Sequence, residues 1–367
     1  MATAITALWL TDFRCFEEAS FEPDPDGLTV LRGENGAGKT SVLEAVAWLA
    51  TQRSFRGAAR EALVRRNSER SVIRATVRHP ERRVLLEAEL PVQGVVRMQL
   101  NRQPVRRRAE LAEVFTVSVF SPDDLALVQG GPDRRRHLLD EVLASRHPRH
   151  QALIDDVERV VRQRNALLRQ SSGQTRSDVL DTLDVWDARL SAAGDALAGA
   201  RRELVEVLGP LVRRAYAQLA DAHEADDLPS MQYRQSWEGT LEQALSAARH
   251  EDLRRQVSTV GPHRDELAIL LGDRPARTQA SQGEQRTCAL ALRLAAHLLV
   301  TEERGQPPVL LLDDVFSELD HRRAAALVGQ LPTGQVLLTT AVDPPAAVSP
   351  DRVVEVSAGR LATSGGR

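Results

Sequence analysis

The sequence is almost without lysine. Of its 48 basic residues, one is a lysine, Lys39, and the other 47 are arginines. Against such a bias, a single lysine marks a position that arginine does not serve. Arginine carries a planar fork of donors, whereas lysine carries a compact charge on a thin stem. Lys39 therefore predicts a site too narrow for a guanidinium.

Cysteines and long apolar runs are also scarce. Two cysteines, Cys15 and Cys288, lie far apart in the sequence, which argues against a disulfide framework and fits a reducing compartment. The apolar stretch "CALALRLAAHLLV" is interrupted by Arg293 and His297, so we expect no membrane span. The start "MATAITALWLTDFRCF" lacks the basic start and apolar block of a signal peptide. We expect a cytoplasmic protein without a membrane partner.

The net charge is small, but the charges are unevenly placed. The 367 residues carry a formal net charge of −3, and a chain of this length predicts about two domains. Residues 51–109 hold 15 arginines against five acidic residues. This segment is either a surface that contacts phosphates or a set of arginines on the outer faces of strands. The alternation of Arg74 and Arg78 with apolar neighbours favours the second interpretation, and both stay open.

The stretch "LRGENGAGKT" surrounds the single lysine. It holds Gly33, four further residues, and then Gly38, Lys39 and Thr40. In such a loop the backbone N–H groups surround phosphate oxygens, the lysine reaches the β- and γ-phosphates, and the threonine hydroxyl binds Mg²⁺. The strand-like "GLTVL" before it and the helix-like "TSVLEAVAWLA" after it give the required context. We predict ATP and Mg²⁺ as cofactors, held by Gly33, Glu34, Asn35, Gly36, Ala37, Gly38, Lys39, Thr40 and Ser41.

A second group of motifs lies about 240 to 270 residues further along. The apolar run in "PPVLLLDDVFSELD" ends in Asp313 and Asp314. Asp313 is placed to hold Mg²⁺ beside Thr40, and Asp314 is placed to orient or deprotonate the attacking water. The preceding "SQGEQ" would open a helix with its N-terminus toward a phosphate, through Ser281, Gln282, Gly283 and Glu284. The separation of the two groups requires a large insertion.

The residue pattern changes twice along the chain. Alternating strand candidates come first, and residues 71–77, 83–90 and 95–100 predict an antiparallel β meander. From Pro122 to about Leu219 the pattern is helical, with a stripe at Ile154, Val157, Val161 and Leu168 and a polar turn at 171–178. After Pro229 come a short hairpin at 265–275, a helix from Ser281, a buried strand at 308–314, a helix from His321, and strands at 335–341 and 352–356.

A regular heptad pattern marks the second long helix. Its apolar positions are spaced alternately by three and four residues until Pro210 limits the pattern. We expect this helix to pair with the preceding one, either as a coiled-coil-like hairpin or as ordinary bundle helices. The seam consists of Leu183, Trp186, Leu190, Ala193, Leu197, Ala200, Leu204, Val207 and Leu211.

These features predict an α/β fold of the P-loop NTPase class. An ATPase head, with a mixed sheet and the β meander, would comprise residues 1–120 and 255–367. An inserted α-helical domain with the short hairpin would comprise residues 121–254.

The ordered set of phosphate loop, long insertion, "SQGEQ", aspartate pair and "SELD" resembles the ABC-type ATPases. Within them the chain looks most like the RecF family. The resemblance is carried by "DFRCF", "GENGAGKTSVLEA", "RSFR", "FSPDDLALVQGGPDRRRHLLD", "RNALL", "VGPHRDEL", "ASQGEQR" and "LLDDVFSELD". It implies an ATP-dependent homodimer in which the signature "SQGE" of one subunit caps the nucleotide of the other. It also implies binding to duplex or gapped DNA and slow, DNA-stimulated ATP hydrolysis that acts as a dimerisation switch.

The same resemblance implies a pathway and further site residues. RecF proteins act with RecR and RecO, and indirectly with RecA, in recombinational gap repair, and they support DNA replication and the SOS response. Arg14 would contact the nucleotide or have a structural role, Gln129 resembles a Q-loop glutamine, and Thr340 is a candidate switch residue. Candidate DNA contacts are Arg53, Arg56, Arg106, Arg107 and Arg108.

Three other functions compete with this one. An ABC transporter subunit would not need the helical insertion. A DNA tether related to SMC proteins would need much longer coiled coils. A clamp with a purely structural ATP would differ only by the absence of turnover.

Overall fold

The computed structural model describes residues 2–171, 177–220, 227–330, 334–341 and 348–363. By their contacts, the described residues form two compact units. The first comprises Met1–Asp124, Ala217–Asp221 and Ala289–Arg367, and the second comprises Leu125–Tyr216 and Ala222–Cys288. Residues 255–288, which we predicted as part of the ATPase head, therefore pack with the helices in the second unit.

The first unit contains two six-stranded sheets. One has the order β2-β1-β4-β5-β6-β7 and is antiparallel throughout. Its β4 (Arg70–Arg78), β5 (Arg83–Pro91) and β6 (Arg97–Leu100) are the predicted meander. The sequence prediction had not included β2 or β7. The remaining strands are β1 (Ala4–Phe13), β2 (Phe16–Phe21) and β7 (Gln103–Pro104).

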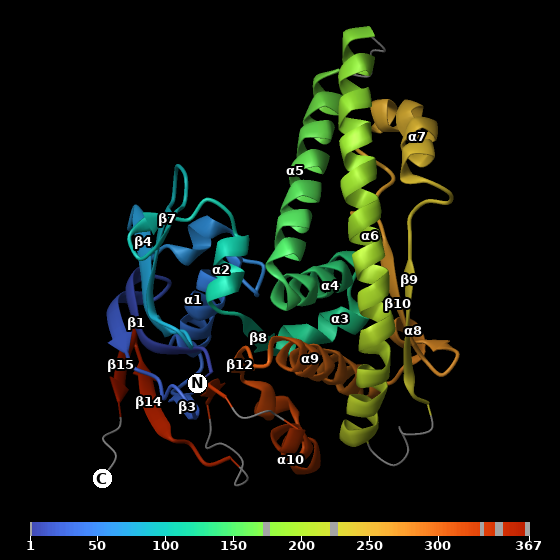
Figure 1. The fold of residues 1–367 in the computed structure, drawn as a ribbon. Coiled ribbons are helices and arrows are strands. Elements are labelled where there is room, and N and C mark those ends of the chain that lie inside the picture. Colours follow the sequence, from blue (N-terminus) through green and yellow to red (C-terminus); the bar gives the residue numbers. More distant parts are fainter. Residues whose placement is uncertain (1, 172–176, 221–226, 331–333, 342–347, 364–367) are drawn as a thin grey trace. The chain divides into compact units, whose positions relative to one another are not determined.

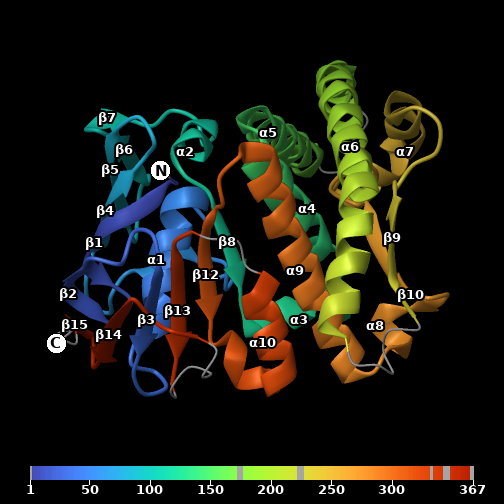
Figure 2. The ribbon, with the colours of Figure 1, turned by 60° about the horizontal axis from the view of Figure 1, so that its bottom comes forward.

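The other sheet positions the nucleotide motifs. Its order is β15-β14-β3-β13-β12-β8, and the five strands from β14 to β8 run parallel. Figure 2 shows β3, β13 and β12 side by side in this sheet. In chain order the strands are β3 (Leu28–Arg32), β8 (Val117–Phe120), β12 (Val309–Asp313), β13 (Val336–Thr340), β14 (Arg352–Ser357) and β15 (Arg360–Thr363).

Helix α1 (Lys39–Thr51) is apolar on nearly all sides because both sheets cover it. Its Val42, Leu43, Val46 and Leu49 belong to one core cluster with residues of β1, β4, β5, β12 and β13. A helix that is hydrophobic all round is a buried one. The first unit also contains α2 (Ala109–Val114), α10 (His321–Gln330) and the larger part of α9 (Gln282–Arg304).

The second unit is mainly helical. Its helices are α3 (Leu125–Gln129), α4 (Pro132–Arg146), α5 (Pro148–Gln170), α6 (Ser177–Leu219), α7 (Leu241–Arg255) and α8 (Ala276–Gln279). A three-stranded antiparallel sheet joins β9 (Pro229–Arg234), β10 (Glu266–Leu271) and β11 (Arg274–Pro275). The predicted hairpin at 265–275 is present, whereas α7 and β9 had not been predicted.

Helices α5 and α6 lie side by side in Figure 1, as the hairpin prediction required. Val160 of α5 packs in one cluster with Leu190 and Ala198 of α6, and Leu168 packs with Leu183. Ile154, Val157 and Leu168 of the predicted stripe are buried, and Val160 is buried beside a partly buried Val161. Residues 172–176 of the predicted polar turn lie outside the described residues.

Helix α6 continues through Pro210 to Leu219, where the helical pattern of the sequence was predicted to end. The buried face also moves along the helix. Leu190, Leu197 and Leu204 are buried as the heptads require, but Val207 is 39% exposed and Leu208 is buried in its place. A straight helix with 3.6 residues per turn drifts in this direction against a 3.5-residue repeat. The bundle-helix alternative therefore fits α6 better than a coiled coil.

Among the described residues, we find no helix with both the length and the apolar character that a membrane crossing requires.

Candidate nucleotide-binding site

The loop between β3 and α1 needs its glycines for steric reasons. A Cβ atom on Gly33 would lie 2.1 Å from the carbonyl oxygen of Val356 in β14. Gly38 has a φ of 111°, and a Cβ atom there would lie 2.5 Å from the Cys15 sulfur. The first glycine permits close packing against a neighbouring strand, and the second permits the left-handed turn into the helix. The loop thus ends directly at the N-terminus of α1, where backbone N–H groups favour an anion.

Lys39 is directed back into this loop. Its Nζ donates hydrogen bonds to the carbonyl oxygens of Gly33 at 2.7 Å and Glu34 at 2.9 Å. Burial lowers the pKa of Lys39, while Asp314 and Asp313 act in the opposite direction. The two carbonyls surround a single nitrogen atom, a geometry that suits an ammonium better than the planar fork of arginine. Two carbonyl oxygens therefore hold Lys39 at the loop, where the sequence prediction places a phosphate.

The strand order brings Thr40 to Asp313, although they are far apart in the sequence. The Thr40 hydroxyl donates to Oδ1 of Asp313 at 2.7 Å, as the prediction of a shared Mg²⁺ site requires. Burial raises the pKa of Asp313, and the two hydroxyl groups that donate to it act in the opposite direction. Mg²⁺ is commonly bound by one or two carboxylates together with substrate phosphates. The described residues contain no cluster of three or more His, Cys, Asp or Glu side chains that could hold a metal. A site with one carboxylate and one hydroxyl fits Mg²⁺ that is shared with nucleotide.

Thr339 belongs to this group and was missed in the sequence. Its hydroxyl donates to the same Oδ1 of Asp313 at 2.7 Å and accepts from the backbone N–H of Asp314 at 3.0 Å. Asp314 has a φ of 48°, so the chain turns sharply as it leaves β12. Thr339 thus holds the carboxylate of Asp313 and the backbone of Asp314. The sequence carries one indication of it, the two threonines at the end of the predicted strand 335–341.

Thr340, the candidate switch residue, is buried at the end of β13, where it pairs in register with Arg32 of β3. It stays a candidate, next to the threonine that contacts the aspartates.

Arg14 is bound to the protein itself. Its Nε and Nη2 donate to the two carboxylate oxygens of Glu44 in α1, each at 2.7 Å, and its Nη1 donates to the carbonyl oxygen of Ala62 at 2.8 Å. The Glu44 carboxylate also accepts a hydrogen bond from Ser54 and is fully buried. This geometry supports the structural alternative for Arg14. Contact with a nucleotide would require the pair with Glu44 to open.

The signature motif forms a capping box at the start of α9. The backbone N–H of Ser281 donates to the Glu284 carboxylate at 2.6 Å, and the backbone N–H of Glu284 donates to the Ser281 hydroxyl at 3.2 Å. This reciprocal pair stabilises a helix N-terminus. Burial alone would raise the pKa of Glu284, but hydrogen bonds with Ser281 and Arg274 lower it. The predicted helix start is present, in the second unit, with Gln282 and Gly283 in its first turn.

Gln129 lies with the signature motif. Its side-chain amide donates to the side-chain oxygen of Gln285 at 2.7 Å, immediately after the capping box. Both residues belong to the second unit, whereas Asp313 and Asp314 belong to the first. The described contacts of Gln129 therefore connect it with the signature helix.

The candidate DNA contacts lie in loops of the first unit. Arg53 and Arg56 follow α1, and Arg106, Arg107 and Arg108 lie between β7 and α2. Arg56, Arg106 and Arg107 are exposed. Arg56 also lies near enough to Asp313 for its charge to act against the rise in the pKa of that carboxyl.

Comparisons with known proteins cover nearly the whole chain. Residues 4–360 match the family described as RecF/RecN/SMC N terminal domain. DNA replication and repair protein RecF of Streptomyces avermitilis is 42% identical over 360 residues, which cover 92% of this chain and 94% of that protein. The protein of the same name from Arthrobacter sp. is 40% identical, with 92% of each chain covered.

Solved structures give the same picture. A structure of the recombination mediator protein RecF-ATP in the RecFOR pathway has a TM-score of 0.88 and 25% identity, with 99% of this chain and 98% of that chain covered. The head of an SMC protein bound to a winged-helix domain of ScpA has a TM-score of 0.56 and 15% identity, with 98% and 97% covered, and is similar in fold alone.

Proposed function

This chain belongs to the RecF family of ABC-type ATPases, and we propose that it is an ATP-dependent DNA-binding protein of recombinational gap repair. The observation that carries the proposal is the group of Lys39, Thr40 and Asp313, which lie where a phosphate and its Mg²⁺ would bind, in a chain that also has a capped signature helix. The relatives carry the name DNA replication and repair protein, and the similar ATP-bound structure belongs to the RecFOR pathway.

In the proposed mechanism the backbone of the phosphate loop and Lys39 bind the triphosphate of ATP. Thr40 and Asp313 would hold Mg²⁺ with the phosphates, and this ion would neutralise charge during hydrolysis. Thr339 fixes the Asp313 carboxylate, and Asp314 orients the attacking water. Ser281 and the N-terminus of α9 of a second subunit cap the γ-phosphate, so that ATP stabilises a homodimer.

We place this dimer on DNA in the cytoplasm, where it would act with RecO and RecR and promote RecA loading at gaps. Hydrolysis would be slow and DNA-stimulated, and it would release the dimer. Support for replication and for the SOS response belongs to the same proposal. The tether alternative is weaker, because α5 and α6 have 23 and 43 residues and form only a short hairpin.

The decisive experiment measures the size of the protein in solution with and without ATP–Mg²⁺ and DNA. We expect the wild type to change from monomer to dimer with ATP. Ser281→Arg should bind ATP, because its own phosphate loop is intact, but it should not dimerise. Lys39→Arg should fail to dimerise although it keeps the charge. Thr240→Arg is the matched control, because it also removes an N-cap hydroxyl in the second unit, on α7.

A titration tests whether the site is shared. Ser281→Arg subunits added to wild type, at concentrations where the wild type dimerises, should lower turnover by more than simple dilution. A strictly linear decrease would mean that the site is not shared between subunits, and this would overturn the ABC-type mechanism.

A further inference from the structure

Two segments that resemble the RecF family have no role in the nucleotide site described above. They are "GGPDRRRHLLD", residues 130–140, and "VGPHRDEL", residues 260–267. In the second unit they contact each other. Arg135 donates through Nε and Nη2 to both carboxylate oxygens of Glu266, at 2.8 and 3.0 Å, and Arg136 donates to the carbonyl oxygen of Asp265. Both arginines are buried, whereas the Glu266 side chain is 33% exposed, and the hydrogen bonds are charge-assisted.

The remaining nitrogen of Arg135 holds the end of α3. Nη1 donates to the carbonyl oxygens of Leu127 at 3.2 Å and Gly130 at 2.9 Å. A helix of five residues is unstable by itself, and its last carbonyl groups need partners. The Arg135 guanidinium donates to these carbonyl groups and also to Glu266, so it connects the end of α3 to Glu266. The position of Gln129, the last residue of α3, therefore depends on Arg135.

Gln129 connects the end of α3 to the signature motif. Its amide donates to Gln285, whose own amide donates to the carbonyl oxygens of Ala276 at 3.0 Å and Arg277 at 3.1 Å. Gln285 is 5% exposed and follows Glu284 of the capping box directly. An unbroken series of hydrogen bonds thus leads from Glu266 through Arg135, α3 and Gln129 to the first turn of α9.

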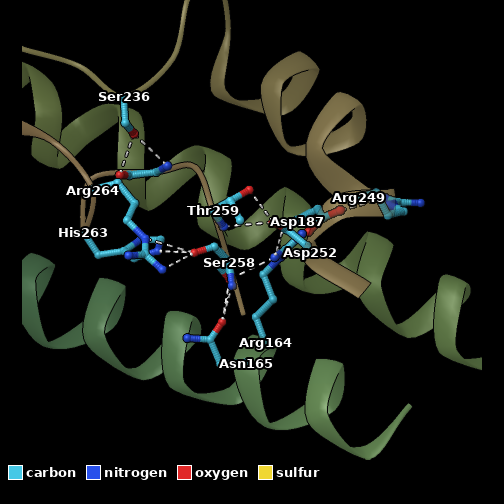
Figure 3. A network of polar contacts seen from close by, with 11 residues as sticks. Arg164, Asn165, Asp187, Ser236, Arg249, Asp252, Ser258, Thr259, His263 and Arg264 are labelled. Atoms are coloured by element: carbon cyan, nitrogen blue, oxygen red, sulfur yellow. Dashed lines mark hydrogen bonds and ion pairs between the residues drawn. The ribbon is translucent and has the colours of Figure 1, made fainter. Parts of the chain in front are cut away.

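The other end of the series is firmly anchored. Figure 3 shows the polar network around residues 258–264, which precede Glu266. Arg164 of α5 is fully buried and donates to Asp187 of α6 at 2.7 Å, to Asp252 of α7 at 2.6 Å and to Ser258 at 2.9 Å. Side chains of three helices thereby fix the segment that leads into β10 and Glu266.

We propose that Arg135 is a positioning residue for the composite ATP site. It holds the end of α3 against Glu266, so that Gln129 and Gln285 fix the N-terminus of α9 in the orientation that caps the nucleotide of a second subunit. The inference rests on the proposed function, because it needs an ATP-dependent dimer. It assigns Gln129 to the alignment of the signature helix.

The test compares Arg135→Gln, Arg135→Lys and Gln129→Ala with the wild type. The control is Arg159→Gln, which removes an exposed arginine that pairs with Asp156 on α5. We expect Arg135→Gln to bind ATP with unchanged affinity as a dilute monomer but to weaken ATP-dependent dimerisation about tenfold. Arg135→Lys keeps a charge beside Glu266 but cannot reach all four acceptors, so it should recover part of this loss. The control should dimerise like the wild type.

A double-mutant cycle separates positioning from a general effect on folding. If Arg135 acts through Gln129, the double variant Arg135→Gln/Gln129→Ala should dimerise no worse than Arg135→Gln alone. Additive losses would overturn the inference. If Arg135→Gln does not fold, Gln129→Ala decides, because this side chain is exposed and its loss leaves the core intact. Normal dimerisation of Gln129→Ala would also overturn the inference. A wild type that does not dimerise with ATP would refute the proposed function itself, and the inference with it.

Discussion

At the scale of single residues, arginines on the strands of the antiparallel six-stranded sheet lie beside carboxylates of the neighbouring strand. Arg70 and Arg97 both pair with Glu89, and Arg74 pairs with Glu87. These pairs favour the interpretation that much of segment 51–109 is a solvated outer face of strands. Arg106 and Arg107 differ, because they lie exposed in the loop before α2, where Glu110 approaches Arg107 only to 3.8 Å. Loop arginines are therefore better placed than strand arginines to contact phosphates.

This difference predicts the salt dependence of DNA binding. Removing one phosphate-binding arginine should reduce the slope of log affinity against log salt by about one for duplex DNA. We expect the triple variant Arg106→Gln/Arg107→Gln/Arg108→Gln to flatten the slope, measured by fluorescence anisotropy across a salt series. The matched triple Arg70→Gln/Arg74→Gln/Arg97→Gln should keep the wild-type slope. If the wild type and the loop triple variant had equal slopes, the three loop arginines would not contact DNA phosphates.

Single residues also show what the sequence could predict about the site. Gly33, Lys39 and Thr40 were predictable because their geometry is local, in one loop between a strand and a helix. Asp313 was predictable because it ends an apolar strand. Thr339 was missed, because its contact depends on β13 lying between β3 and β12, and the order of strands in a sheet is set by tertiary packing.

At the scale of elements, α6 shows where local rules fail. Proline removes one backbone hydrogen bond and normally breaks a helix interior. Pro210 is exposed, and so is Glu206, whose carbonyl oxygen loses its partner and can accept from water instead. Leu208 and Val212 are buried on either side of the proline. Packing of the apolar face thus outweighs the loss of one backbone hydrogen bond at Pro210. This balance depends on tertiary packing, so the sequence pattern alone did not show it.

The polar network at Arg164 joins the elements of the second unit, and it predicts a specific loss of stability. Arg164→Leu would leave Asp187 and Asp252 as buried charges without this partner, and we expect a cost of about 3–5 kcal/mol. Urea unfolding followed by tryptophan fluorescence measures it, and two of the four tryptophans, Trp186 and Trp237, lie in this unit. Arg159→Leu, on the same helix but in an exposed pair with Asp156, should cost less than about 1 kcal/mol. A small loss for Arg164→Leu would show that the network tolerates an apolar side chain.

At the scale of the whole molecule, both units contain a histidine that folding keeps neutral. Burial lowers the pKa of His297 in the first unit to about 4, and burial together with Arg264, Arg136 and Arg164 lowers the pKa of His263 in the second unit to about 4. In the unfolded chain both side chains return to the ordinary pKa of histidine, near 6.5. The unfolded state therefore binds more protons than the folded state between pH 6.5 and pH 4.

This difference predicts that the protein loses stability as the pH falls through this window. The contribution of His297 should be complete above pH 6.5 and should fall by roughly 2 kcal/mol by pH 5.

His297→Gln can still form a hydrogen bond with Ser118, the present partner of His297, but it cannot be protonated. We therefore expect this variant to lose about 2 kcal/mol less than the wild type between pH 7.5 and pH 5, in urea titrations followed by tryptophan fluorescence, to which Trp9 and Trp48 of the first unit contribute. His250→Gln, which replaces an exposed histidine of α7, should lose as much as the wild type. Equal acid losses for the wild type and His297→Gln would mean that His297 is protonated in the folded protein, contrary to its burial at 1% exposure.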